Sequence, residues 1–210
     1  MGVVNLAYKV KSIITEENNS FSFSIENLIE NQKHMISKYK FPEETECKML
    51  ERFYPQIMEE VQEYLYEVNN QSMDNEKLAI LEIMDIYLYI GSVITHLIVD
   101  YNLNKDHFKK IILEELPSEY KTKLQIDKFN DVISEILFLN IRRQYPERKY
   151  HKKLKELSKD EKELRRFSVL LNLVYILKYI SSTINKRYSK YSAEELNTLI
   201  TEKSQFNIDL

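Results

Sequence analysis

The scarcity of glycine and proline constrains the fold of this chain more than any other feature of its sequence. Only 2 glycines and 4 prolines occur among 210 residues. All-β folds need many turns built from such residues, and dinucleotide-binding α/β folds need glycine-rich loops around phosphate groups. The sequence therefore predicts an all-α fold. A phosphate ligand would have to be held without a P-loop or a GxGxxG turn.

Length and apolar spacing predict one helical domain. A chain with 43% hydrophobic and 30% charged residues can bury its own core at this length. We expect a single all-α domain over residues 1–210, with a candidate site on helices at about 56–101 and a C-terminal helical part at about 159–204. Apolar residues at helical spacing predict helices at about 5–16, 24–38, 56–68, 76–101, 105–115, 118–123, 127–142, 159–188 and 193–204. Another helix is expected to start at about Pro42, and Pro55 is expected to break or restart it.

Cysteine content and net charge bear on the cellular compartment of the protein and on nucleic acid as a partner. The one cysteine, Cys47, cannot form an internal disulfide, which favours a reducing compartment. The N-terminus lacks the charged-then-apolar pattern of a secretory signal, so we expect a cytoplasmic protein. The net charge is −3, which gives no general attraction to nucleic acid. A basic stretch from Arg142 to Lys155 is the exception, and nucleic acid is not an expected partner.

One segment is apolar almost all round. Leu78 to Val99 has this composition, which is typical of a helix buried inside a bundle. The segment is also long enough to span a bilayer. Glu82 and Asp85 lie within it, however, and each central carboxylate costs about 2.5–3.5 kcal/mol on insertion into a membrane. We therefore expect no membrane partner.

The apolar helices also predict self-association. Leu78 to Val99 and Val169 to Ile184 are both apolar over more than one face. A bundle of this size encloses one such helix more easily than two, and soluble monomers rarely leave a large apolar stripe exposed. A homodimer or larger homo-oligomer would cover it. The alternative is a monomeric bundle in which the C-terminal helices cover the core.

Four carboxylates form the most informative constellation. Glu60 and Glu63 end an EExxE motif, and Glu82 and Asp85 form an ExxD motif after a spacer of eighteen residues. Residues three apart share a helix face, with Cβ atoms about 5–6 Å apart. Two antiparallel helices with a short link can bring the two pairs face to face. Because carboxylate oxygens are the ligands that Mg²⁺ prefers, these four residues predict a magnesium site.

The second motif lies on a narrow polar stripe. Glu82, Asp85, Tyr89, Ser92 and His96 fall in one sector of the helix at about 100° per residue. Two other interpretations remain: the glutamates of the first motif could be a solvated helix face, and the acids of the second could pair with buried lysine or arginine. We expect His96 to be a core histidine rather than a catalytic one.

These motifs resemble those of a known superfamily. Gln56–Val68 and Ile80–Ser92 look like the two metal helices of the all-α NTP pyrophosphohydrolases, which include MazG-type enzymes and dimeric dUTPases. In dimeric dUTPases the second motif typically runs ExxDxLHFLLS. Glu82, Asp85 and Ser92 match that register. The resemblance implies a helical bundle of the all-α NTP pyrophosphatase type, here with extra C-terminal helices.

A second similarity lies downstream. Asn140, Arg143 and Gln144 resemble the NxxRQ element of dimeric dUTPases, and Tyr150 and Lys152 resemble a later Tyr-x-Lys. In the family these residues help to hold the phosphates. The chain departs from the pattern, because the glycine after RQ and the Lys-Asn pair before NxxRQ are missing. A solvated basic loop is the alternative interpretation of this stretch.

The resemblance implies a reaction and a cofactor. It implies hydrolysis of a nucleoside triphosphate, dUTP or another dNTP, to the monophosphate and pyrophosphate. Mg²⁺, or Mn²⁺ in its place, would be held by the four acids. Glu60 or Glu63 would orient or deprotonate the attacking water, and Ser92 and the downstream residues would bind substrate. The alternative is a non-enzymatic helical interaction or regulatory protein that retains the fold.

Overall fold

The all-α class is confirmed. The computed structural model describes residues 9–38, 46–70, 73–101, 105–144 and 158–209, and this part of the chain forms eight helices and one two-stranded sheet. The helices are α1 Ile25–Lys38, α2 Glu46–Asn69, α3 Met73–Val99, α4 Lys105–Leu113, α5 Ser118–Lys121, α6 Ile126–Gln144, α8 Lys159–Arg187 and α9 Ala193–Asp209. The strands are β1 Ile14–Glu17 and β2 Ser20–Phe23.

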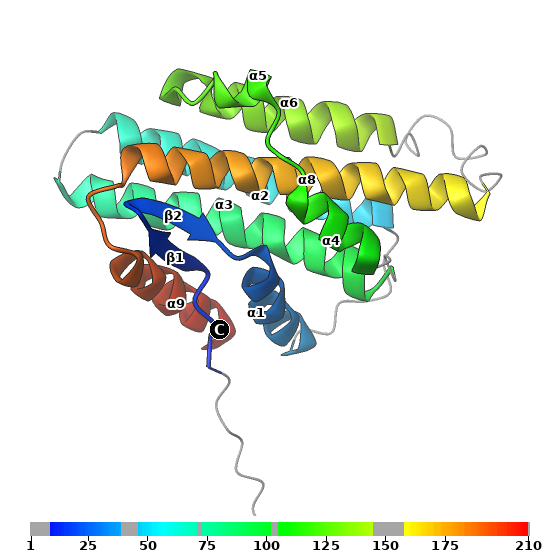
Figure 1. Ribbon diagram of the computed structural model, residues 1–210, viewed down its shortest axis with the longest axis horizontal. Helices are drawn as coiled ribbons and strands as arrows, with labels where there is room; N and C mark the ends of the chain where they lie inside the picture. The colour runs from blue at the N-terminus through cyan, green and yellow to red at the C-terminus, as the bar shows by residue number, and fades with distance from the viewer. Residues whose placement is uncertain (1–8, 39–45, 71–72, 102–104, 145–157, 210) are drawn as a thin grey trace, which may run out of the picture.

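Two long helices, α3 and α8, organise the bundle. Helix α2 packs along α3, α6 packs along α8, and α3 and α8 contact each other. Helix α1 also lies against α3, and α9 contacts both α3 and β1. Figure 1 shows α8 running the length of the molecule, with α5 and α6 on one side and α3, the hairpin, α1 and α9 on the other. The two helices predicted to be most apolar thus lie at the centre.

Aliphatic side chains from these two helices form a large part of the core. Ile83, Ile90 and Leu97 of α3 and Leu173 and Leu177 of α8 are all fully buried. Burying such a side chain contributes about 1.5–3 kcal/mol relative to leaving it in water. The near-continuous apolar pattern therefore has a structural explanation, since both helices are covered on several faces by their neighbours.

In the described part of the chain, two helices are long and apolar enough to cross a membrane, by length and composition alone. They are residues 75–99 of α3 and the whole of α8. In their most apolar windows, 78% and 56% of the residues are buried inside the protein. Core helices of soluble proteins have the same composition. The cytoplasmic location and the absence of a membrane partner remain predictions.

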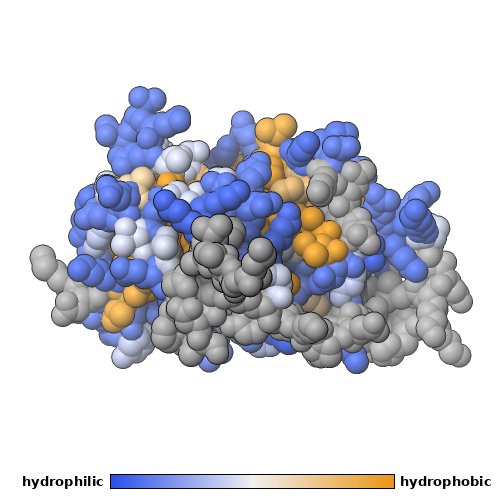
Figure 2. All heavy atoms as spheres, turned by 90° about the horizontal axis from the view of Figure 1, so that it is seen from below, coloured by the Kyte–Doolittle hydropathy of each residue, from blue (hydrophilic) through white to orange (hydrophobic). Residues whose placement is uncertain are grey.

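The argument for self-association is weaker in the folded chain. The apolar residues of α3 and α8 that prompted it are largely buried by the chain's own elements. On the face drawn in Figure 2, hydrophilic side chains dominate the coloured surface, and hydrophobic ones form small separate groups. The homodimer therefore stays a prediction with less support than the sequence suggested.

A β-hairpin replaces the end of the first predicted helix. The helix predicted at 5–16 is wrong over its described part, because residues 9–13 have no regular structure and Ile14–Glu17 pairs antiparallel with Ser20–Phe23. Asn18 and Asn19, which join the strands, have φ values of 52° and 60°. Two consecutive positive φ angles make the turn that best matches the twist of paired strands, and asparagine tolerates this conformation.

Two asparagines from distant helices hold the hairpin. Asn197 of α9 accepts hydrogen bonds from the backbone N–H groups of Ile13 and Ile14 at 2.9 and 3.0 Å, and donates to the carbonyl of Ile14. Asn185 of α8 bonds both the N–H and the carbonyl of Phe21 in the same way. An isolated two-stranded hairpin is marginally stable at best, so these contacts explain why it forms here.

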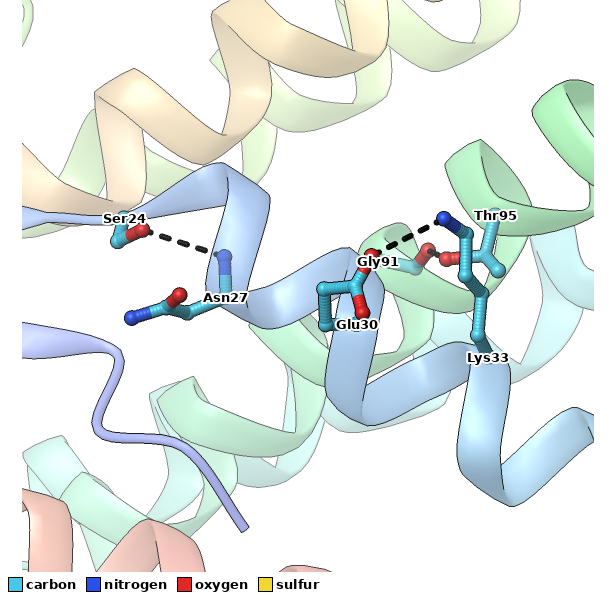
Figure 3. Close-up of polar contacts among 6 residues, drawn as sticks. All are labelled: Ser24, Asn27, Glu30, Lys33, Gly91 and Thr95. Atoms are coloured by element: carbon cyan, nitrogen blue, oxygen red, sulfur yellow. Dashed lines mark hydrogen bonds and ion pairs between the residues drawn. The ribbon is translucent and has the colours of Figure 1, made fainter.

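Helix α1 begins where the sequence predicts. The Ser24 hydroxyl accepts a hydrogen bond from the Asn27 N–H at 3.2 Å, which is the N-cap interaction (Figure 3). Glu30 and Lys33 form an exposed ion pair at 3.2 Å on the same helix. Such a pair contributes about 0–1 kcal/mol, so the cap and the buried face position α1.

Pro55 does not interrupt its helix, contrary to the prediction. Helix α2 is continuous from Glu46 to Asn69 with Pro55 inside it. A proline in a helix interior removes one hydrogen bond and costs about 3 kcal/mol. Pro55 itself is exposed, whereas Phe53 and Ile57 on either side are buried in the core. Packing of these flanking side chains offsets the local cost.

Gly91 marks the closest approach of α1 to α3. A Cβ atom at this position would lie 2.8 Å from Cγ of Leu28, a fully buried residue of α1. Figure 3 shows Gly91 on α3, with its carbonyl accepting the Thr95 hydroxyl at 2.8 Å. Alanine normally stabilises a helix interior by about 1 kcal/mol relative to glycine. We expect Gly91→Ala to lower the free energy of unfolding by about 1–3 kcal/mol instead, because the site is overpacked.

Urea denaturation measures this effect, and a second variant tests its cause. In a Leu28→Ala background the clash disappears, so adding Gly91→Ala there should be neutral or stabilising. A stabilising effect of Gly91→Ala in the parent protein would contradict the close approach of the two helices.

Candidate metal centre

Helices α2 and α3 form an antiparallel pair, as the sequence predicts. Glu60 of α2 lies near Glu82 of α3, and the ring of Phe53 lies 5.7 Å from the ring of His96. The later residue of α2 thus lies beside the earlier residue of α3, so the two helices run in opposite directions. The two acidic motifs therefore face each other across this helix pair.

Three of the four predicted carboxylates converge. Glu60, Glu63 and Glu82 each offer one oxygen, and these oxygens lie within 4.8 Å of one another. Oxygens on opposite sides of a Mg²⁺ ion are about 4 Å apart, given bonds of about 2.0–2.1 Å. Glu60 and Glu82 are half-buried, whereas Glu63 is exposed. Small side-chain adjustments would therefore bring the three oxygens to coordination distance at a site that is open to solvent.

The fourth carboxylate has a different partner. Asp85 is buried, and its Oδ2 lies 2.7 Å from Nζ of Lys203 on α9. The interpretation in which a buried acid pairs with a lysine is thus confirmed for Asp85. The sequence predicted neither this lysine nor a role for the C-terminal helix at the acidic motifs.

The crowding of acidic groups shifts the pKa of Glu60. Its burial, followed by the charges of Asp85, Glu82 and Glu63, raises the pKa of the Glu60 carboxyl to about 8. A carboxyl group with this pKa is largely protonated at neutral pH while the centre holds no cation. A nearby cation would favour its ionised form.

The neighbouring groups respond to the same environment. Burial and the charge of Asp85 raise the pKa of Glu82, and Lys203 partly opposes this. Burial also raises the pKa of Asp85, despite the hydrogen bond from Lys203. Burial lowers the pKa of Lys203, but Asp85 and the glutamates raise it overall. Burial and the charges of Glu60 and Asp85 raise the pKa of Tyr89 as well. The acids thus create a strongly negative local potential.

The donor set fits a hard divalent cation. The group consists of carboxylates from Glu60, Glu63 and Glu82, without histidine or cysteine among the described residues that converge there. Oxygen ligands of this kind suit Mg²⁺ or Mn²⁺ rather than a structural Zn²⁺. A dication would also relieve the repulsion that raises the pKa of Glu60.

Comparison with protein-family models, curated proteins and solved structures found no match. The resemblance to the all-α NTP pyrophosphohydrolases therefore stays a prediction from the motif residues alone. Any function must be inferred from the acidic residues and what surrounds them.

Two other residues of the polar stripe on α3, Ser92 and His96, have different partners. Ser92 is buried, and its hydroxyl donates to Oε1 of Gln32 on α1 at 2.7 Å. His96 is buried beside Phe53, with Nδ1 2.6 Å from Oδ2 of Asp100. This placement supports a core role for His96. Ser92 is engaged by α1, and its predicted role in substrate binding stays a prediction.

The downstream residues are described only in part. Asn140, Arg143 and Gln144 belong to the last turns of α6, and their side chains lie outside the described part of the chain. Tyr150 and Lys152 lie entirely outside it. Their predicted phosphate-binding roles stay untested.

The packing of α6 against α2 nevertheless shows where the backbone of Arg143 lies relative to Glu60. Gln62 of α2 bonds Asn130 of α6 at 2.9 Å, and Ser134 lies 3.8 Å from Met58, so the two helices are antiparallel. The same register places Arg143 opposite the beginning of α2. That level is about 16 Å along the helix axis from Glu60, at 1.5 Å per residue. A substrate that reaches both residues would have to bridge this separation, less the reach of the two side chains.

The metal-free centre should make stability depend on pH. Because the folded-state pKa of Glu60 is raised from 4.5 to about 8, the folded protein binds more protons than the unfolded chain between these values. Stability in a chelator should therefore fall as pH rises from about 4.5 to about 8. Urea denaturation across this range measures the slope, which Glu60→Gln should reduce. An unchanged slope in that variant would assign the dependence to other groups.

Proposed function

We propose that this protein is a magnesium-dependent nucleoside triphosphate pyrophosphohydrolase. The observation that carries the proposal is the convergence of Glu60, Glu63 and Glu82 from two consecutive helices. Three carboxylates held this close together repel one another unless a cation lies between them. The motif resemblance supports the same reaction class.

In this reaction, water attacks the α-phosphorus of the triphosphate. The bond between that phosphorus and the bridging oxygen breaks, and the leaving pyrophosphate takes the electron pair. The proton of the water passes to a carboxylate, and the products are a nucleoside monophosphate and pyrophosphate. Bound Mg²⁺ would supply charge neutralisation at the phosphate oxygens.

The protein residues would orient the reactants. Glu60 or Glu63 would orient or deprotonate the attacking water, because their carboxylates lie at the point where the acids converge. Glu63 and Glu82 would complete the ligand set. Arg143 and Lys152 would neutralise the distal phosphates, with the planar guanidinium of arginine suited to a bidentate contact. The favoured substrate is dUTP or another dNTP.

A panel assay tests the proposal. Purified protein is incubated with each canonical NTP, each dNTP and dUTP, with and without Mg²⁺, and the products are separated. Monophosphate and pyrophosphate that form only with metal would support the proposal. Formation of diphosphate and phosphate would indicate a different bond cleavage.

Two other outcomes redirect the assignment. Equal turnover of dUTP and the four canonical dNTPs would favour a MazG-type housekeeping activity over a dUTPase. No turnover of any nucleotide would favour the non-enzymatic helical interaction protein.

We also propose that the protein is a homodimer or a larger homo-oligomer. The resemblance implies this assembly, and a two-fold interface is the commonest form of self-association. Light scattering after size exclusion would give about twice the chain mass of 25.3 kDa for a dimer. A mass equal to that of one chain would exclude it.

A further inference from the structure

The C-terminal helix brings a positive charge to the acidic centre. The buried side chains of Leu196 and Ile200 hold α9 against the bundle, and Asn197 fixes it to β1. Lys203 lies one helical turn beyond Ile200 and reaches Asp85 at 2.7 Å. Its side chain is 30% exposed and that of Asp85 only 7%. This ion pair is therefore partly shielded from water.

The lysine divides the four acids into two groups. Glu60, Glu63 and Glu82 present oxygens to a common point, whereas Asp85 presents one oxygen to the ammonium group. A metal ion at Asp85 would have to displace an ammonium group at hydrogen-bond distance, and two cations so close would repel each other. The three glutamates meet no such competitor among the contacts of the described residues.

We infer that the ammonium group of Lys203 takes the place that a second metal ion would have at Asp85. The protein then holds a single divalent ion at Glu60, Glu63 and Glu82, while Asp85 stays paired with the lysine. This inference rests on the proposed function, because it assumes that the glutamates bind metal. It assigns to α9 an electrostatic role at the site in addition to its packing role.

A purely structural lysine makes a different prediction. If Lys203 only fastened α9 to the bundle, removing its charge would weaken the fold and leave the number of bound ions unchanged. If it replaces a cation, removing its charge frees Asp85 as a ligand and a second ion can enter.

Counting bound Mn²⁺ per chain separates these roles. Calorimetry, with free Mn²⁺ measured by electron paramagnetic resonance, should give one ion for the parent and two for Lys203→Met. Lys203→Arg keeps the charge and should give one. Lys190→Met is the matched control, because Lys190 pairs with Glu76, another acid of α3, outside the acidic cluster. It should also give one ion.

A double variant tests whether Asp85 is the new ligand. Lys203→Met combined with Asp85→Asn should return the count to one ion. Circular dichroism and thermal unfolding of each variant verify that it is folded.

Several results would overturn the inference. Two ions in the parent protein would do so whatever the variants show. An equal count in the parent and a folded Lys203→Met variant would leave the metal site intact and reject the role of the lysine. No Mn²⁺ binding by either protein would reject the metal centre itself, and the inference with it.

Discussion

Glu82→Gln should abolish the response of the protein to Mg²⁺ and its nucleotide hydrolysis. Glu82 is the member of the converging set supplied by α3, so its loss leaves only ligands from one helix. Removing a single preorganised hydrogen-bond donor from a catalytic centre lowers turnover by about 100- to 1,000-fold, and losing a ligand to the required metal ion should cost at least as much. The midpoint temperature of thermal unfolding should rise with increasing Mg²⁺ for the parent, because the ion binds the folded state, and should stay constant for the variant.

Two controls make this result specific to the site. Glu59→Gln changes a neighbouring but exposed glutamate, and it should keep both the metal response and the turnover. The metal-free Glu82→Gln protein should be at least as stable as the parent, because Glu82 contributes to the repulsion around Glu60. A Glu82→Gln variant that responds to Mg²⁺ like the parent would show that the metal binds elsewhere.

Phe129→Ala should cause the largest loss of stability. Phe129 of α6 is 1% exposed, and its ring centroid lies 4.7 Å from that of Tyr64 on α2 and 5.7 Å from that of Tyr179 on α8. Truncating a buried phenylalanine leaves a cavity and costs about 3–5 kcal/mol. Urea denaturation should show this loss as a lower midpoint.

An exposed site provides the comparison. Leu113 is 82% exposed, so Leu113→Ala should change the free energy of unfolding by no more than about 0.5 kcal/mol. A cost below about 1 kcal/mol for Phe129→Ala would mean that α6 is not docked between α2 and α8 in solution. That result would also remove the register used to place Arg143.

Much of the helical framework could be predicted because its signals are local. The helices predicted at 105–115, 127–142 and 159–188 agree closely with α4, α6 and α8, since apolar spacing and capping act within a few turns. The start of the helix predicted at 24–38 is confirmed for the same reason, since Ser24 caps α1. The convergence of Glu60, Glu63 and Glu82 followed from spacing within each helix and a short link between them.

Errors arose where distant contacts outweigh local preference. Pro55 should end a helix by itself, yet buried side chains on both sides keep α2 continuous. The β-hairpin carried a local signal in Asn18 and Asn19, but its strands are short. Its stability depends on Asn185 and Asn197, which lie more than 160 positions further along the chain.

The acidic centre shows the same division between sequence and tertiary structure. The sequence by itself determined an all-α chain and two i,i+3 acidic pairs on neighbouring helices, because helical periodicity fixes which side chains share a face. Only the tertiary structure decided that Asp85 pairs with Lys203 and leaves three glutamates together. The packing of α9 on the hairpin and on α3 sets that contact, and no pattern within either segment encodes a partner 118 positions away.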